Sequence, residues 1–300
     1  MIPRITFFKT RIFSLRASGK PLDELHRLAG RCSVQVVIGL MVLGTGCNPP
    51  TERWRDAQTL KNQSIALLEN AAETDKEGKL LSEAAQGFRR LSIEQPLDPI
   101  GLQNLCVTLY SRLRWLDPTD LSGEAKAICS EFESSIGKLR KLTPESPDPD
   151  YLLFRYLQWK NERAAAIQAL RSACNVAQPI PASYYQLVLM LKEENEREHA
   201  AEIQQSLERG LAIAPSNLTL AVNYLDALAK RESPEFSKQL EGVRELSRPL
   251  TSRTQSPIPG LIDRAADAVK NSNWKVAQTQ IAFLRNVMVS EIAYQQDLHA

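Results

Sequence analysis

Apolar residues recur at helical spacing along the chain from Thr51 onward. The clearest stretch lies between Ala182 and Asn217, where a polar break at residues 193–196 separates two amphipathic segments. The apolar positions of these segments are, in order, Tyr184, Leu187, Val188 and Leu191, then Ala200, Ile203, Leu207, Gly210, Leu211 and Ala214. The pattern predicts a pair of helices, and the small residues Ala200 and Gly210 are expected to let neighbouring helices approach closely.

Prolines divide the helical pattern into units of nearly constant length. Pro144, Pro179, Pro215 and Pro249 each follow a helical stretch, at intervals of 35, 36 and 34 residues. Proline ends a helix because it has no N–H to donate to the preceding turn. A period near 34 residues is typical of two-helix solenoid repeats, and strand signals are scarce. We therefore predict an all-α fold with about five antiparallel helix pairs in residues 53–290.

The second predicted helix between Ala182 and Asn217 resembles the second helix of a tetratricopeptide repeat (TPR). Leu207, Gly210, Leu211 and Pro215 stand where that family keeps a large, a small, a large and a helix-ending residue. The resemblance extends over about residues 80–290 and implies a right-handed solenoid that binds proteins or peptides on its surface. The tryptophan–glycine–tyrosine signature of the family's first helix is mostly absent, so generic helical hairpins remain the alternative.

The first 46 residues differ from this repeat region. Seven lysines and arginines precede or flank the start of an apolar run of about ten residues, 34–43. A bilayer-spanning helix needs about 20 apolar residues, whereas a run of this length is typical of a secretory signal. Because the positive charges lie on the N-terminal side of the run, the chain that follows it is predicted to be exported.

The residues after the apolar run, Gly44-Thr45-Gly46-Cys47, resemble a bacterial lipobox. The family prefers Leu, Val or Ile at the position that Gly44 occupies. The resemblance implies that a diacylglyceryl group is attached to the thiol of Cys47 and that cleavage makes Cys47 the first residue of the mature protein.

The resulting domain prediction has four parts: a signal peptide (1–46), a lipidated tether (47–52), the TPR-like domain (53–290) and a terminal tail (291–300). The lipobox implies a protein anchored in a membrane of the bacterial cell envelope and facing the periplasm or the exterior. A single-pass membrane anchor and a secreted protein are the alternatives.

Charge and motif content limit the other function classes. The net charge of +2 is concentrated in the leader, and residues 47–300 carry −3, which is not the electrostatic footprint of a nucleic-acid-binding protein. The sequence contains no phosphate-binding loop, dinucleotide fingerprint, zinc-protease motif or nucleophile elbow. Cys106, Cys129 and Cys174 lack metal-binding spacing and are expected to be small buried residues, with one disulfide among them as the alternative in an oxidising compartment. We predict no catalytic residue, cofactor or metal.

An aromatic cluster near residue 155 is the candidate partner-binding site. Large aromatic residues at helical spacing usually pack in the core, but on a solenoid surface they can also anchor a peptide. Neighbouring basic residues could hold an acidic peptide or a C-terminal carboxylate. The candidate residues are Tyr151, Arg155, Tyr156, Trp159 and Lys160.

These observations predict a non-catalytic scaffold for protein or peptide partners, held at a membrane through Cys47. Some large bacterial lipoproteins are similar in combining a lipobox, helical repeats and a β-propeller of the FG-GAP type with an ASPIC/UnbV tail. The chain could therefore be the front-end module, or a truncated relative, of such a protein. An enzyme with an unrecognised site is the remaining alternative.

Overall fold

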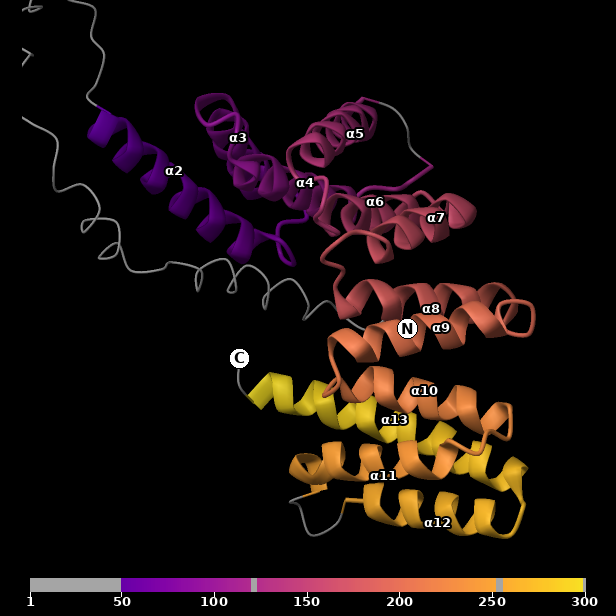
Figure 1. The fold of residues 1–300 in the computed structure, drawn as a ribbon. Helices are drawn as coiled ribbons and strands as arrows, with labels where there is room; N and C mark the ends of the chain where they lie inside the picture. The colour runs from indigo at the N-terminus through magenta and orange to yellow at the C-terminus, as the bar shows by residue number, and fades with distance from the viewer. Residues whose placement is uncertain (1–49, 120–122, 252–255, 299–300) are drawn as a thin grey trace, which may run out of the picture. The chain divides into compact units, whose positions relative to one another are not determined.

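The described residues of the computed structural model, 50–119, 123–251 and 256–298, are mainly helical and contain no strand. The prediction of an all-α protein is confirmed. The chain divides into two compact units, residues 1–62 and 63–300. The first is represented by the beginning of α2, and the second contains the helical repeats (Figure 1). The α-helices are α2 (Pro50–Ala71), α3 (Lys79–Glu94), α4 (Pro99–Leu113), α5 (Glu124–Leu142), α6 (Asp148–Trp159), α7 (Arg163–Cys174), α8 (Pro181–Asn195), α9 (Ala200–Ile213), α10 (Leu218–Lys230), α11 (Phe236–Ser247), α12 (Ile258–Lys270) and α13 (Trp274–Leu298).

From α4 onward the helices form five successive hairpins: α4–α5, α6–α7, α8–α9, α10–α11 and α12–α13. Neighbouring hairpins pack on each other through α4 and α6, α7 and α8, and α9 and α10. The prolines that set the period follow the ends of α5, α7, α9 and α11. The predicted solenoid of about five helix pairs is therefore confirmed, with α3 packed on α4 ahead of the first pair.

The packing of α9 shows why a small residue is needed at one position in the repeat. A Cβ atom added to Gly210 would lie 3.0 Å from Leu220 Cδ1 and 3.2 Å from Tyr184 Cβ. Gly210 therefore lets α9 approach α8 and α10 closely, as predicted. The same prediction was wrong for Ala200, which is exposed because the first turn of α9 points this residue to solvent.

The last two hairpins do not continue the serial stack, the arrangement in which each hairpin packs on the next through its first helix. It is α13, rather than α12, that packs against α10, while α12 packs between α11 and α13. Gln278 on α13 donates a hydrogen bond to the carbonyl of Ala229 at 3.1 Å, and the ring of Trp274 meets that of Phe236 edge-on, 5.6 Å between centroids. Helices α10 to α13 thus form a closed group of four, which places α13 beside α10 (Figure 1).

Two helix ends lie inside the predicted tether and tail, and the limits of the four predicted parts stay predictions. α2 begins at Pro50, inside the predicted tether, because proline is well tolerated in the first turn of a helix. α13 continues to Leu298, through most of the predicted tail, and residues 289–298 contain no proline or glycine to stop it. Cys47 and the predicted signal peptide lie outside the described residues. Within the described ranges, no helix has the length and apolar character needed to cross a bilayer.

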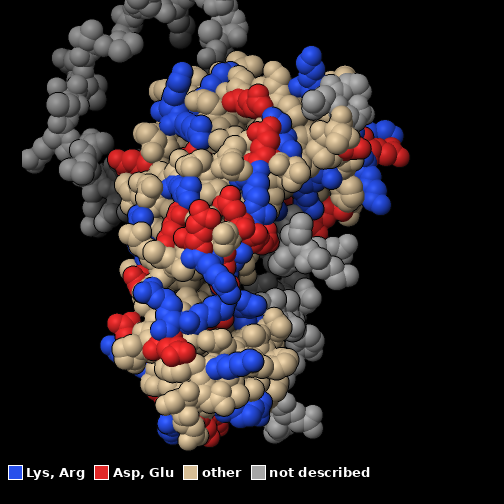
Figure 2. All heavy atoms as spheres, turned by 90° about the vertical axis from the view of Figure 1, so that its right-hand side faces the viewer, with Lys and Arg blue, Asp and Glu red and all other residues tan. Residues whose placement is uncertain are grey.

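Charged side chains pair between neighbouring hairpins. Figure 2 shows acidic side chains gathered in the middle of one face, with basic side chains bordering them. Glu193 and Glu194 end α8, and Glu196 and Glu198 follow in the turn that leads to α9. Arg171 on α7 forms two hydrogen bonds with the Glu202 carboxylate, at 2.7 and 2.8 Å. Such contacts help to set the register between hairpins.

Candidate interaction site

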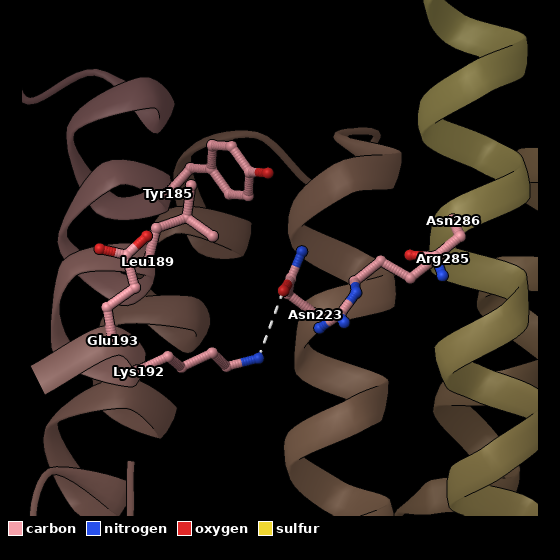
Figure 3. A pocket seen from close by; sticks show the side chains of 7 residues that line it. All are labelled: Tyr185, Leu189, Lys192, Glu193, Asn223, Arg285 and Asn286. Atoms are coloured by element: carbon pink, nitrogen blue, oxygen red, sulfur yellow. Dashed lines mark hydrogen bonds between the residues drawn. The ribbon is translucent and has the colours of Figure 1, made fainter. Parts of the chain in front are cut away.

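Helices α8, α10 and α13 enclose an open hollow of about 400 Å³ (Figure 3). We call it the α8–α10–α13 hollow. Its wall combines an aromatic ring and an aliphatic side chain with amides and charged groups. The lining residues are Tyr185, Leu189, Lys192, Glu193, Asn223, Arg285 and Asn286.

The hollow has one wall on each of the three helices, and the local sequence positions the side chains of the walls on α8 and α10. On α8, Tyr185, Leu189 and Lys192 are spaced by four and three residues, so they share one helix face. On α10, the buried Asn223 donates from Nδ2 to the carbonyl of Thr219 at 2.9 Å. This bond leaves Asn223 Oδ1 to accept from Lys192 Nζ at 3.4 Å, across the floor of the hollow (Figure 3).

Four charged side chains beside the hollow form a closed arrangement, which we call the charge square: Lys192, Glu196, Asp226 and Lys230. Lys192 Nζ lies 2.9 Å from Asp226 Oδ2, and Lys230 Nζ lies 3.2 Å from the same oxygen. Glu196 Oε1 is 2.6 Å from Lys230 Nζ and 4.0 Å from Lys192 Nζ. Lys192 and Asp226 are 34 residues apart, as are Glu196 and Lys230. Equivalent repeat positions therefore carry opposite charges, and α8 complements α10.

The third wall adds a further positive charge. Arg285 on α13 lies 3.8 Å from Asp226 Oδ2, and its side chain is 38% exposed. Glu193 also lines the hollow, and its carboxylate faces Arg163 on α7 at 3.5 Å. Since the charge square sums to zero and Glu193 is balanced by Arg163, Arg285 leaves one positive charge in excess among the described side chains at the hollow.

Tyr185 in the hollow and Asp226 in the charge square both have shifted pKa values. Burial raises the pKa of Asp226, but the fields and hydrogen bonds of Lys192 and Lys230 outweigh it and hold the pKa below its ordinary value, so Asp226 is a carboxylate near neutral pH. Burial raises the pKa of Tyr185, although nearby Arg285 opposes the rise. Tyr185 therefore keeps its proton and can act as a hydrogen-bond donor.

The aromatic cluster predicted as a partner-binding site lies on α6 and not at this hollow. Tyr156 is only 1% exposed. Its ring packs on Phe132, 4.7 Å between centroids, and its hydroxyl donates to Glu133 Oε1 at 2.5 Å. Burial and the bond to Glu133 raise the pKa of Tyr156. Tyr156 is thus a core residue that a partner cannot touch without a rearrangement.

The other residues of the predicted set are partly exposed but held by neighbours. The guanidinium of Arg155 lies 5.7 Å from the ring centroid of Tyr110. Trp159 Nε1 donates to the carbonyl of Leu116 at 3.4 Å, and Lys160 pairs with Glu162 at 2.6 Å. The ring of Tyr151 lies 5.6 Å from that of Phe154. All five predicted residues therefore come together on α6 and its C-terminal end, and partner binding there stays a prediction.

The three cysteines after Cys47 are buried free thiols, as expected for small apolar positions. Burial raises the pKa of Cys106 and also that of Cys174, the latter to about 12, which keeps both in the unreactive thiol form. Across the described ranges, no group of three or more histidine, cysteine, aspartate and glutamate side chains is placed to hold a metal ion.

The residues of the hollow were not predicted from the sequence, although the sequence contains a charge pattern that points to some of them. Aligning the chain with itself at the 34-residue period pairs Lys192 with Asp226 and Glu196 with Lys230. That comparison would have indicated complementary charges on adjacent repeats. Nothing in the period points to Arg285, because α13 reaches α10 by leaving the serial stack.

No protein-family model matches the chain, and no curated protein matches it significantly. Among solved structures, the chain is similar to the one described as the functional characterisation of pilF of Pseudomonas aeruginosa, with a TM-score of 0.44 and 12% sequence identity. The match covers 83% of this chain and 99% of that one.

Proposed function

We propose that the protein is a non-catalytic scaffold that binds a segment of a partner protein in the α8–α10–α13 hollow. The observation that carries this proposal is the convergence of three helices on an open hollow with an excess positive charge. Solenoids of helical hairpins expose extended surfaces of this kind, on which side chains can vary without disturbing the core.

The chemistry of the hollow favours an acidic segment. Arg285 and Lys192 offer charge-assisted hydrogen bonds to a carboxylate, and Tyr185 offers a neutral donor. Leu189, partly exposed in the wall, offers an apolar contact to a neighbouring side chain of the same segment. The expected ligand therefore has a carboxylate flanked by an apolar residue.

Photo-crosslinking from inside the hollow tests this proposal. A photoreactive amino acid at Leu189 should capture one discrete partner in the cell of origin. The same residue at Gln205, which is exposed on α9, is the matched control and should not. Equal capture from both positions, or capture from Gln205 alone, would contradict binding in the hollow.

We also propose that Cys47 carries a lipid that holds this scaffold at a membrane of the bacterial cell envelope. The supporting observations are the basic leader, the short apolar run and the small residues before Cys47. Only Asn48 and Pro49 separate Cys47 from the first residue of α2, so a lipid there would keep the start of α2 near the membrane surface. A single-pass anchor and secretion are the competing outcomes.

The intact mass of the protein recovered from native membranes tests the anchor. We expect the mass of residues 47–300 plus a diacylglyceryl group and an acyl chain, and loss of membrane association in Cys47→Ser. An unmodified mass would contradict the proposal. A mass far above 33.6 kDa would support the alternative of a front-end module within a longer lipoprotein.

A further inference from the structure

Asp226 lies at the centre of three cations. Its Oδ2 atom is 2.9 Å from Lys192 Nζ, 3.2 Å from Lys230 Nζ and 3.8 Å from a guanidinium nitrogen of Arg285. The side chain of Asp226 is 5% exposed, so water shields these interactions weakly. Asp226 is thus a carboxylate of the chain itself, placed next to the hollow proposed to bind a carboxylate of a partner.

The three contacts differ in kind. Both lysines lie within hydrogen-bond distance of Asp226 and also contact Glu196, at 2.6 Å from Lys230 and 4.0 Å from Lys192. Arg285 lies beyond hydrogen-bond distance of Asp226, and its partly exposed guanidinium lines the hollow. A guanidinium has five N–H donors in a planar fork that suits two-point contact with a carboxylate. Arg285 is therefore the cation that can change partner at the lowest cost.

We propose that Asp226 is an internal competitor for Arg285. A partner carboxylate that enters the hollow takes up the guanidinium of Arg285, while Asp226 stays paired with Lys192 and Lys230. Asp226 would then set the strength with which the hollow binds acidic segments. This inference rests on the proposed function, because it needs a carboxylate ligand in the hollow.

The charge balance around the hollow supports this assignment. With the charge square and the Glu193–Arg163 pair each neutral, Arg285 supplies one positive charge, which one ligand carboxylate neutralises. Replacing Asp226 by a neutral residue would leave two positive charges and would remove the competing anion. A ligand anion should then bind more tightly, and its affinity should fall more steeply with added salt.

Sodium propionate is the probe, with propionamide as its neutral isostere, and binding is followed by NMR of the arginine Nε–Hε groups in the full chain at constant ionic strength. In the wild-type protein we expect a saturable shift of the Arg285 signal with propionate and none with propionamide. Asp226→Asn should lower the dissociation constant for propionate about 5-fold, as expected for one neighbouring charge at a partly exposed site.

Two variants are controls for competition. Glu196→Gln removes a negative charge from the same square, but from a position that pairs with the lysines rather than Arg285, and should change the dissociation constant less than about 2-fold. Arg285→Gln should abolish saturable binding. Equal tightening in Asp226→Asn and Glu196→Gln would overturn the proposal, because it would show a general field effect. Unchanged or weaker binding in a folded Asp226→Asn protein would also overturn it.

A wild-type measurement keeps the proposal testable if Asp226→Asn does not fold. The carboxyl ¹³C signal of Asp226 should move with the same saturation curve as the Arg285 signal, because Asp226 loses Arg285 when propionate binds. Movement of Arg285 without Asp226 would overturn the competition. Crosslinking from Leu189 together with no propionate binding would leave the scaffold proposal standing and overturn only this inference.

Discussion

Two regions of this protein carry aromatic and basic side chains close together, and they have opposite roles. On α6, Tyr156 is 1% exposed and its hydroxyl is paired with Glu133. At the α8–α10–α13 hollow, Tyr185 is partly exposed beside Arg285. Similar residue types thus stabilise the core in one region and line an open surface in the other. Composition alone does not separate the two roles, because they depend on which helix face is covered by a neighbour.

The largest expected effect on stability comes from truncating Tyr156, and truncating Tyr185 is the comparison. Tyr156→Ala should lower the free energy of unfolding by about 3–5 kcal/mol, because it removes a fully buried ring. Tyr185→Ala should cost less than about 1.5 kcal/mol, since its ring is only partly covered. Urea unfolding followed by circular dichroism measures both. Similar losses for the two variants would mean that the regions do not differ in burial as described.

The charge square should be the next most sensitive feature. Lys192→Met removes the closest cation from the buried Asp226 and should destabilise the fold by about 1–3 kcal/mol. Lys160→Met at the end of α6 is the matched control, because its partner Glu162 is 44% exposed whereas Asp226 is 5% exposed, and it should change stability by less than about 0.5 kcal/mol. A small loss for Lys192→Met, equal to that of the control, would contradict a structural role for the square.

The pH dependence of stability should differ between wild type and Asp226→Asn. Because the folded-state pKa of Asp226 is below its ordinary value, the unfolded chain binds more protons than the folded one at acidic pH. The contribution of Asp226 to the free energy of unfolding is therefore fully present above its pKa in the unfolded chain, near 4. It is lost as the pH falls through its pKa in the folded protein. The stability difference between the two proteins should narrow as pH falls from 6 to 3. If the free energies of unfolding of the two proteins change with pH in parallel, Asp226 makes no pH-dependent contribution to stability.

Two arginine variants should have the smallest effect on stability. They give the most direct test between the two regions, because only one of them should reduce partner capture. Arg285→Gln should reduce photo-crosslinking from Leu189, whereas Arg155→Gln should leave the yield unchanged. Both substitutions should alter the free energy of unfolding by less than about 1 kcal/mol, because each side chain is partly exposed. Loss of capture in Arg155→Gln alone would support the predicted partner site on α6 and contradict binding in the hollow.

Sequence alone determined the helical content and the repeat. Proline positions and apolar spacing act within a few residues, so the ends of α5, α7, α9 and α11 and the close approach at Gly210 followed from them. The buried faces of α8 and α9 were likewise visible in the chain, apart from Ala200 at the start of α9.

Tertiary structure alone decided which helix lies beside α10 and which aromatic ring is covered. Arg285 reaches Asp226 from 59 residues away because α13 packs where a serial stack would place α12. Tyr156 is buried because Phe132 and Glu133 on α5 meet it. Such contacts depend on the path of the chain between distant segments, whereas helical periodicity records only which face of a helix is apolar.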